Sequence, residues 1–131
     1  MQLILRESNL QKANLAESDP RFADLSGTTL IEANLVRAML DAATLEDANL
    51  QRANLFEANL ESTNLRNASL REANLSGVAL HKVNTEGADL WYMNLKDVNL
   101  IGVKRFRGAS LGYTKFCNTT MPDGFINNRD C

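Results

Sequence analysis

Leucine recurs at every fifth position through most of this chain of 131 residues. Between residues 5 and 100, only Pro20 and Thr85 interrupt the register. A small residue, most often alanine, stands two positions before most of these leucines, and asparagine or aspartate usually stands between them. Chance does not hold one register over about a hundred residues, so the chain is built from an internal five-residue repeat.

Neither regular secondary structure accommodates a step of five residues. Five residues advance about 140° around an α-helix, so the leucines would scatter around its axis. In a flat strand an odd step sends successive leucines to opposite faces. The leucines share one core only if the chain bends once per repeat, and asparagine and aspartate are suited to such bends. The pattern therefore predicts a backbone that winds around a core of leucine and alanine.

The repeat resembles that of the pentapeptide-repeat family, whose consensus is Ala-(Asp/Asn)-Leu followed by two variable residues. Residues 53–57 and 58–62 match this consensus as they stand, and the resemblance covers about residues 6–121. It implies an all-β fold, a right-handed quadrilateral β-helix of about six coils with four pentads per coil. The end of the chain resembles that of cyanobacterial members, which favours a cyanobacterial source.

We expect residues 1–121 to form the β-helix and residues 122–131 to form a C-terminal capping tail. After Leu100 the hydrophobic frame shifts by one residue, which predicts a one-residue insertion near residues 101–105. A solenoid must protect its open ends. The tail would do so at the C-terminus, whereas no comparable cap is visible at the N-terminus. Pro20 replaces a core leucine and is expected near a corner.

The two cysteines, Cys117 and Cys131, both lie near the C-terminus. A tail that folds back would bring them together, and a disulfide would then staple the cap. The alternative is two free thiols in a reducing cytoplasm.

The net charge of −2, from 14 basic and 16 acidic residues, offers no general electrostatic reason to bind nucleic acid. With four pentads per coil, residues twenty apart stack, and charged residues then fall into columns. These columns are Lys12–Glu32–Arg52–Glu72, Glu17–Arg37–Glu57 and Arg21–Asp41–Glu61–His81. Most neighbours in them are of opposite sign, which predicts a self-paired surface.

No apolar run approaches the roughly 20 residues that span a bilayer, so no membrane association is expected. The N-terminus lacks the pattern of a secretory signal. As written, the sequence indicates the cytoplasm, and the periplasm or thylakoid lumen would apply if a leader had been trimmed.

The sequence contains no Cys/His cluster, no glycine-rich phosphate loop and no paired-carboxylate pocket. We therefore expect no catalytic, cofactor-binding or metal-binding residues, and a core filled without an interior cavity. The remaining candidate site is a strip of outward apolar residues that could bind a partner. Its members are Ile31, Val36, Phe56, Trp91 and Tyr92. Scattered surface hydrophobes are the alternative interpretation.

The favoured function is a non-catalytic protein-binding or scaffold module with an unknown protein partner, present as a monomer or a weak end-to-end dimer. The alternative is a gyrase-binding protein that imitates DNA, a role known among fluoroquinolone-resistance members of the family. The near-neutral charge, the alternating columns and the short rod disfavour it. A third hypothesis is the regulation of differentiation or stress responses, which is also represented in the family. No residue of this sequence argues for or against it.

Overall fold

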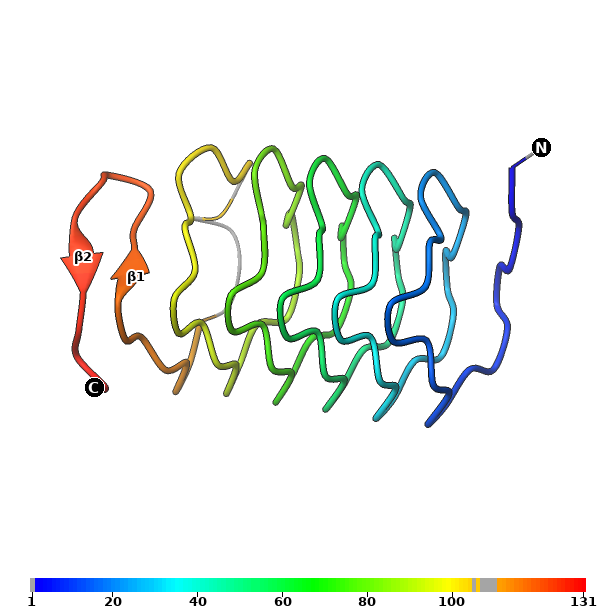
Figure 1. Ribbon diagram of the computed structural model, residues 1–131, viewed down its shortest axis with the longest axis horizontal. Coiled ribbons are helices and arrows are strands. Elements are labelled where there is room, and N and C mark those ends of the chain that lie inside the picture. Colours follow the sequence, from blue (N-terminus) through cyan, green and yellow to red (C-terminus); the bar gives the residue numbers. More distant parts are fainter. Residues whose placement is uncertain (1, 105, 107–110) are drawn as a thin grey trace.

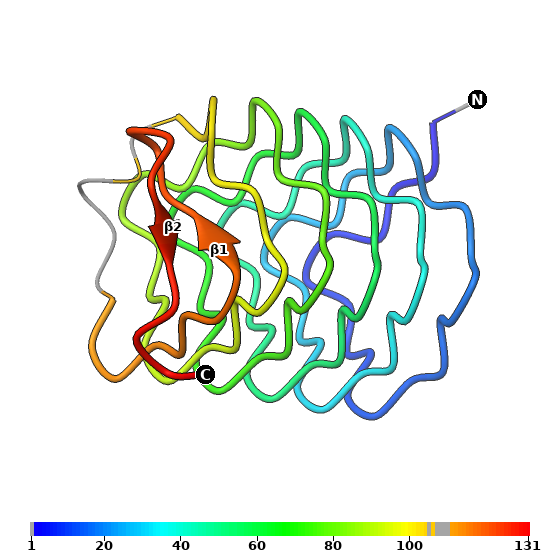
Figure 2. The same cartoon turned by 60° about the vertical axis from the view of Figure 1, so that its left-hand side comes forward.

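A computed structural model describes residues 2–104, 106 and 111–131 as a rod of stacked four-sided coils (Figure 1). Parallel bridges join residues twenty apart, from the pair Ile4 and Asp24 to the pair Asn84 and Lys104. Each coil therefore takes four pentads, as the resemblance to the family implies. The two ends of the chain lie at opposite ends of the rod. The view in Figure 2 shows the same coils following one another along a single axis.

The bends lie at the two outward residues that follow each leucine. At one such turn the Ala53 amide donates to the Leu50 carbonyl (3.0 Å), and Arg52 takes the left-handed conformation with φ of 56°. The side chain of Asn49 accepts a hydrogen bond from the amide of Gln51 at 3.1 Å. The sequence associated the bend with asparagine itself. Asparagine instead precedes the bend and stabilises it through its side-chain oxygen.

Left-handed residues recur at the same repeat position along the rod. Within the described part of the chain, eighteen non-glycine residues have positive φ, and each such conformation costs on the order of 1 kcal/mol. Such conformations persist only where the surroundings compensate for them. The compensation comes from hydrogen bonds between coils, for example from Arg52 N to Arg71 O at 2.9 Å. Turn formation and coil stacking therefore depend on each other.

Asparagines of successive coils also bond to one another. The amide nitrogen of Asn34 donates to Oδ1 of Asn14 (3.2 Å), and that of Asn74 donates to Oδ1 of Asn54 (3.1 Å). Asn94 donates to Asn74 in the same way at 3.3 Å. Asn34, Asn74 and Asn94 each donate from the amide nitrogen along the rod, and the side-chain oxygen of each also accepts from a turn amide. This double use explains why the position favours asparagine over other polar residues.

The core is a set of leucine columns along the rod axis. Every leucine of the repeat from Leu25 to Leu100 is buried, with the alanines of the small position packed beside them. Burial of each leucine contributes roughly 1.5–3 kcal/mol. Leu5, Leu10 and Leu15 are only partly buried, because no coil precedes theirs in the structure.

The N-terminal coils contain a cavity of about 150 Å³ that is half open to solvent. It is lined chiefly by leucines and by Pro20. Proline is smaller than the leucine that the repeat places there, and the next residue of its column is Leu40. The sequence prediction missed the resulting space because it treated Pro20 only as a bend. The cavity is walled almost entirely by apolar groups and offers no chemistry.

The sequence predicts the change of register near residues 101–105, and the bridges between coils set limits on its position. Asn84 and Lys104 still pair at a spacing of 20, whereas Asn94 pairs with Lys115 and Asn99 with Thr120 at a spacing of 21. The additional residue therefore enters after Lys104. Residues 105 and 107–110 lie outside the described part of the chain.

Two short strands close the C-terminal end. Strand β1 (Thr119–Thr120) belongs to the last turns of the coil, and β2 (Ile126–Asn127) returns antiparallel to it. Thr119 pairs with Asn127, and Thr120 pairs with Ile126. Residues 126–131 thereby fold back against the last coil, as Figure 2 shows.

The leucine columns predict that shortening a leucine side chain destabilises the fold more in the middle of the rod than at its N-terminal end. Leu55→Ala removes a fully buried side chain in the middle of the rod, and we expect a loss of about 2–5 kcal/mol in the free energy of unfolding. Leu10→Ala, in the partly buried first coil, should cost distinctly less. Urea denaturation of both variants measures the difference. Equal losses would contradict the idea that stacking on both sides creates the core.

Candidate functional site

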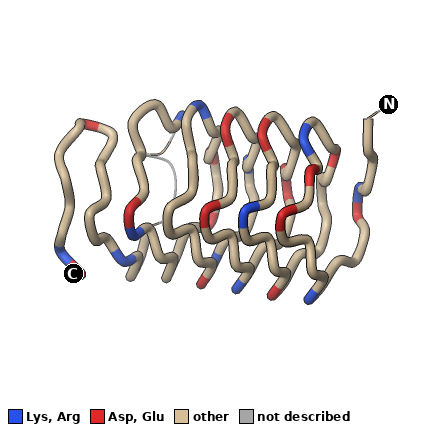
Figure 3. The backbone as a smooth tube through the Cα atoms, in the orientation of Figure 1, with Lys and Arg blue, Asp and Glu red and all other residues tan. Residues whose placement is uncertain are grey.

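The outward charges form ladders along the rod. Glu32 lies between Lys12 (3.6 Å) and Arg52 (3.2 Å), and Arg52 reaches on to Glu72 at 3.8 Å. This is the first column that the sequence predicted. Figure 3 shows basic and acidic positions interspersed along the coils. Exposed pairs of this kind contribute about 0–1 kcal/mol each, so their main effect is to leave a surface of balanced charge.

The second predicted column also forms. Arg37 lies 2.8 Å from Glu57 and 4.0 Å from Glu17. Its hydrogen bond to Glu57, reinforced by the charge of that carboxylate, raises the pKa of Arg37. The charged groups of this column therefore bind one another along the rod.

The third predicted column forms differently. Arg21 pairs with Asp19 of its own turn at 2.6 Å, and no ion pair between Arg21 and Asp41 is present among the described residues. The Asx-type turn brings the Asp19 carboxylate closer than the next coil brings Asp41. A further ladder was not singled out from the sequence, although the same twenty-residue spacing would have shown it. Its members are Glu46, Arg66 and Glu86, joined at 3.9 and 4.0 Å.

An aromatic cluster interrupts this charge pattern near the C-terminal end. The rings of Tyr92 and Tyr113 stack at 4.9 Å with planes 6° apart. Trp91 lies beside both, with ring centres 6.1 and 6.0 Å away. The guanidinium of Arg71 covers Tyr92 at 5.2 Å from the ring centre. We call Arg71, Trp91, Tyr92 and Tyr113 the aromatic cluster.

Backbone geometry determines the arrangement of these rings. Tyr92 and Tyr113 both occupy the left-handed turn position, at φ of 59° and 56°. The Tyr92 amide donates to the Gly112 carbonyl at 2.8 Å, which places the two turns one above the other. A side chain at Gly112 would meet the ring of Trp91 at 2.5 Å, so glycine leaves the space that this ring occupies. The sequence assigned Tyr113 only to the end of the coil, because the register change hid its spacing of 21 from Tyr92.

The predicted partner strip does not form one continuous surface. Val36 and Phe56 occupy the same turn position in consecutive coils, and both are half-buried. Ile31 is half-buried as well, and Trp91 lies sixty residues, or three coils, farther along its column. Among the described residues, no ring contact joins Phe56 to Trp91. Of the five residues, the structure brings only Trp91 and Tyr92 into a cluster.

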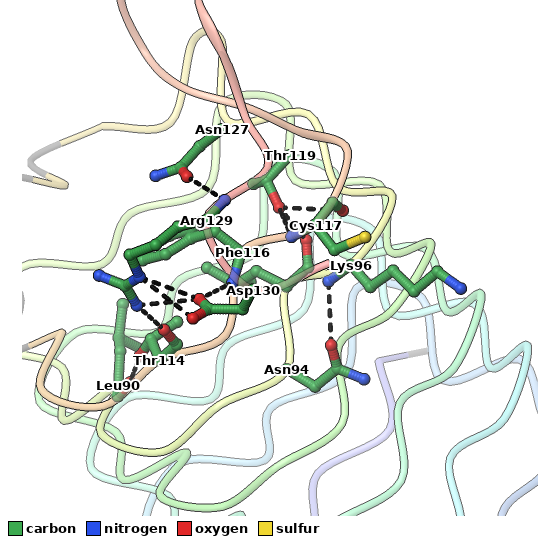
Figure 4. A network of polar contacts seen from close by, with 11 residues as sticks. Leu90, Asn94, Lys96, Thr114, Phe116, Cys117, Thr119, Asn127, Arg129 and Asp130 are labelled. Atoms are coloured by element: carbon green, nitrogen blue, oxygen red, sulfur yellow. Dashed lines mark hydrogen bonds and ion pairs between the residues drawn. The ribbon is translucent and has the colours of Figure 1, made fainter.

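At the C-terminal end, a disulfide joins Cys117 to Cys131, with their Cα atoms 4.9 Å apart. It links the last coil directly to the final residue of the tail. Cys131 is exposed and Cys117 is half-buried. Figure 4 shows the polar contacts around this end of the rod.

Side chains of the tail bond to the last coil where a further coil would otherwise bond. The Phe116 amide donates to the carboxylate of Asp130 (2.8 Å), and the Asn118 amide donates to the side-chain oxygen of Asn128 (2.8 Å). Arg129 donates to the carbonyl of Thr114 at 2.6 Å. In the rest of the rod, backbone groups of the following coil occupy these places. The tail thus substitutes side-chain groups for the backbone of a missing coil.

Charge and ring contacts strengthen this cap (Figure 4). Hydrogen bonding from Arg129, followed by that from the Phe116 amide, lowers the pKa of Asp130. The positive charges of Arg129 and Lys115 act in the same direction. Arg129 also lies over the ring of Phe116, 5.0 Å from its centre.

Two open surface grooves carry polar groups. One, of about 340 Å³, includes His81, Asn99 and Ile101, and the other, of about 400 Å³, includes Arg6 and Glu46. Among the described residues, no three His, Cys, Asp or Glu side chains are grouped so that they could hold a metal ion. That part of the chain also contains no helix of the length and apolarity needed to cross a membrane.

The sequence matches the model of pentapeptide repeats, with eight copies, over residues 4–39, 21–55 and 48–84. No curated protein matches it.

Three solved structures show the same architecture. A pentapeptide repeat protein of Nostoc PCC 7120 is 30% identical with a TM-score of 0.63, and the match covers 84% of this chain and 85% of that one. Rfr23 of the cyanobacterium Cyanothece 51142 is 25% identical with a TM-score of 0.61, covering 91% of this chain and 88% of that one. An Arabidopsis thaliana protein of the thylakoid lumen is 25% identical with a TM-score of 0.57, and the match covers 82% of this chain and 66% of that one. With its repeats and coils so matched, the chain belongs to the pentapeptide-repeat family and folds as a right-handed quadrilateral β-helix.

Proposed function

We propose that this protein is a non-catalytic binding module that docks a protein partner on the aromatic cluster. The observation that carries the proposal is the exposed stack of Tyr92 and Tyr113 beside Trp91. Tyr113 is 72% exposed, although its ring is held by stacking and its turn by the backbone. An aromatic surface that is ordered before binding loses little conformational freedom when a partner covers it.

The composition of the cluster is that of a protein interface. Tyrosine, tryptophan and arginine are the residues most enriched where binding energy concentrates. Here all three types meet within one small area, whereas the ladders elsewhere carry charges that already pair with one another. A partner that covers the aromatic cluster removes apolar rings from water without breaking those ladders. Val36 and Phe56 form a smaller candidate patch, which is already half-buried.

The distribution of perturbed ionisable groups supports a non-catalytic function. Asp19 and Arg21 shift each other's pKa within one surface turn, lowering that of the acid and raising that of the base. The pKa of Asp24 is lowered by hydrogen bonds from Ser26 and Arg6. Such shifts accompany stable ion pairs, whereas a catalytic group needs a cleft in which to meet a substrate.

The compartment follows from the state of the cysteines. Cytoplasmic thiols are kept reduced, so a Cys117–Cys131 disulfide that persists in the cell favours an oxidising compartment. The Arabidopsis relative is described from the thylakoid lumen. Trapping the thiols with an alkylating reagent in intact cells, followed by mass spectrometry, distinguishes the two locations.

Imitation of DNA is the less favoured function. A mimic requires rows of acidic groups, but the ladders Lys12–Glu32–Arg52–Glu72 and Glu17–Arg37–Glu57 alternate in sign. We therefore expect the purified protein to leave the supercoiling activity of gyrase unchanged. A concentration-dependent inhibition that survives Tyr92→Ala/Tyr113→Ala would instead favour the imitation of DNA.

Removal of the exposed rings should abolish partner capture. We expect Tyr92→Ala/Tyr113→Ala to lose a protein that the unaltered chain retains from an extract of its source cells. Phe22→Ala is the matched control, because Phe22 is also an exposed aromatic residue at a left-handed turn position. Circular dichroism establishes that each variant keeps its fold. Equal retention by all three proteins would exclude the aromatic cluster as the docking surface.

A further inference from the structure

We propose that the Cys117–Cys131 disulfide is a redox-operated strap, whose reduction releases residues 126–131 from the edge of the last coil while the rod remains folded. The inference concerns the C-terminal end and does not depend on the docking function of the aromatic cluster. It rests on how the tail is held, which differs from how the coils are held.

The tail contributes little to the hydrophobic core. Phe125 is 75% exposed and Ile126 is 60% exposed, so the apolar residues of this segment remain largely in water. Strands β1 and β2 share only two residue pairs. By contrast, every repeat from Leu25 to Leu80 buries a leucine. Segments with few buried apolar contacts open at lower free energy than the body of a protein.

Four kinds of contact hold the tail. They are the backbone pairing of β2 with β1 and of the Asp130 amide with the Phe116 carbonyl, the side-chain hydrogen bonds of Asn128, Arg129 and Asp130 to the last coil, the placement of Arg129 over Phe116, and the disulfide. The hydrogen bonds lie at the surface, where water competes for the same groups. A disulfide closing a loop of about 15 residues increases the closed population on the order of 100-fold. The covalent bond is therefore the largest single constraint on the tail.

The exposed position of Cys131 makes the disulfide accessible to a dithiol reductant. The thiolate of the reductant attacks Sγ of Cys131, and Cys117 leaves as a thiolate. The second thiol of the reductant then displaces Cys131, which is released as a thiol. Two electrons pass from the dithiol, which becomes a disulfide, to the protein.

Opening would uncover a strand edge. The amides of Phe116 and Asn118 and the carbonyl of Thr114 would lose their side-chain partners in the tail. Unpaired edge groups of this kind accept an additional extended strand. The redox state would thus control access to the C-terminal edge of the rod, whereas the aromatic cluster stays exposed in both states.

Amide hydrogen exchange tests the strap in the full-length protein. With dithiothreitol we expect exchange at Phe116 and Asn118 to accelerate by about 10-fold to 100-fold. Leu55, whose amide donates to Asn74 within the rod, should be unaffected. Counting free thiols establishes that reduction is complete. Unchanged exchange at Phe116 and Asn118, or equal acceleration at Leu55, would overturn the proposal.

A cysteine variant separates the strap from other effects of the reductant. Cys117→Ser/Cys131→Ser should show the fast exchange of the reduced protein without dithiothreitol, and the reagent should change nothing further. The double variant retains Asp130 and Arg129, so its tail can still close through hydrogen bonds. Slow exchange in this variant, equal to that of the oxidised protein, would show that the disulfide does not control the tail.

In the reduced protein, closure should also depend on pH. The lowered pKa of Asp130 means that the closed tail favours its carboxylate, which faces Arg129, Lys115 and the Phe116 amide. This contribution is fully present above the ordinary value of 3.8 and is lost as pH falls through the lowered pKa of the closed state. Titration of the Asp130 carboxylate by NMR, in oxidised and reduced protein, should give the lower pKa in the oxidised form. Equal pKa values in the two forms would contradict release of the tail on reduction.

Discussion

The fold depends on one constraint, which is that a leucine at every fifth residue must reach a common core. The chain satisfies it by bending after each leucine, with a left-handed residue in every turn. Such a turn is unfavourable in isolation for residues other than glycine. It becomes stable because the same backbone groups bond to the coils before and after, so that no coil is independent of its neighbours.

This dependence makes the ends of the rod its weak points. At the C-terminus the chain has no further coil to stack, and Asn128, Arg129 and Asp130 supply side-chain groups in place of backbone groups. These contacts satisfy the hydrogen-bonding groups of the last coil but bury little additional apolar surface. The covalent link between Cys117 and Cys131 therefore matters more there than it would within the coils. At the other end the first leucines remain partly exposed beside an apolar cavity.

Function is confined to the outward positions, because the inward ones are occupied in forming the core. Outward charges pair with one another along the ladders, and the aromatic cluster is the place where that pattern ends. Its rings are aligned by the same coil-to-coil bonds that stabilise the turns. The surface that we propose for docking is therefore held in place by the same backbone hydrogen bonds as the coils.

The sequence alone determined the winding, the leucine core and two of the charge ladders, because each follows from counting residues at a constant spacing. It could not place the bend at the variable residues, since backbone conformation at Arg52 or Tyr92 leaves no mark in residue type. It also missed Tyr113 as a neighbour of Tyr92, because the change of register lies between them and gives a spacing of 21. The space left by Pro20 and the side-chain groups of the tail that replace a coil were decided by tertiary structure. Both depend on which atoms meet across coils. The spacing of residue types shows where the repeat is interrupted, but it does not show which atoms fill the interruption.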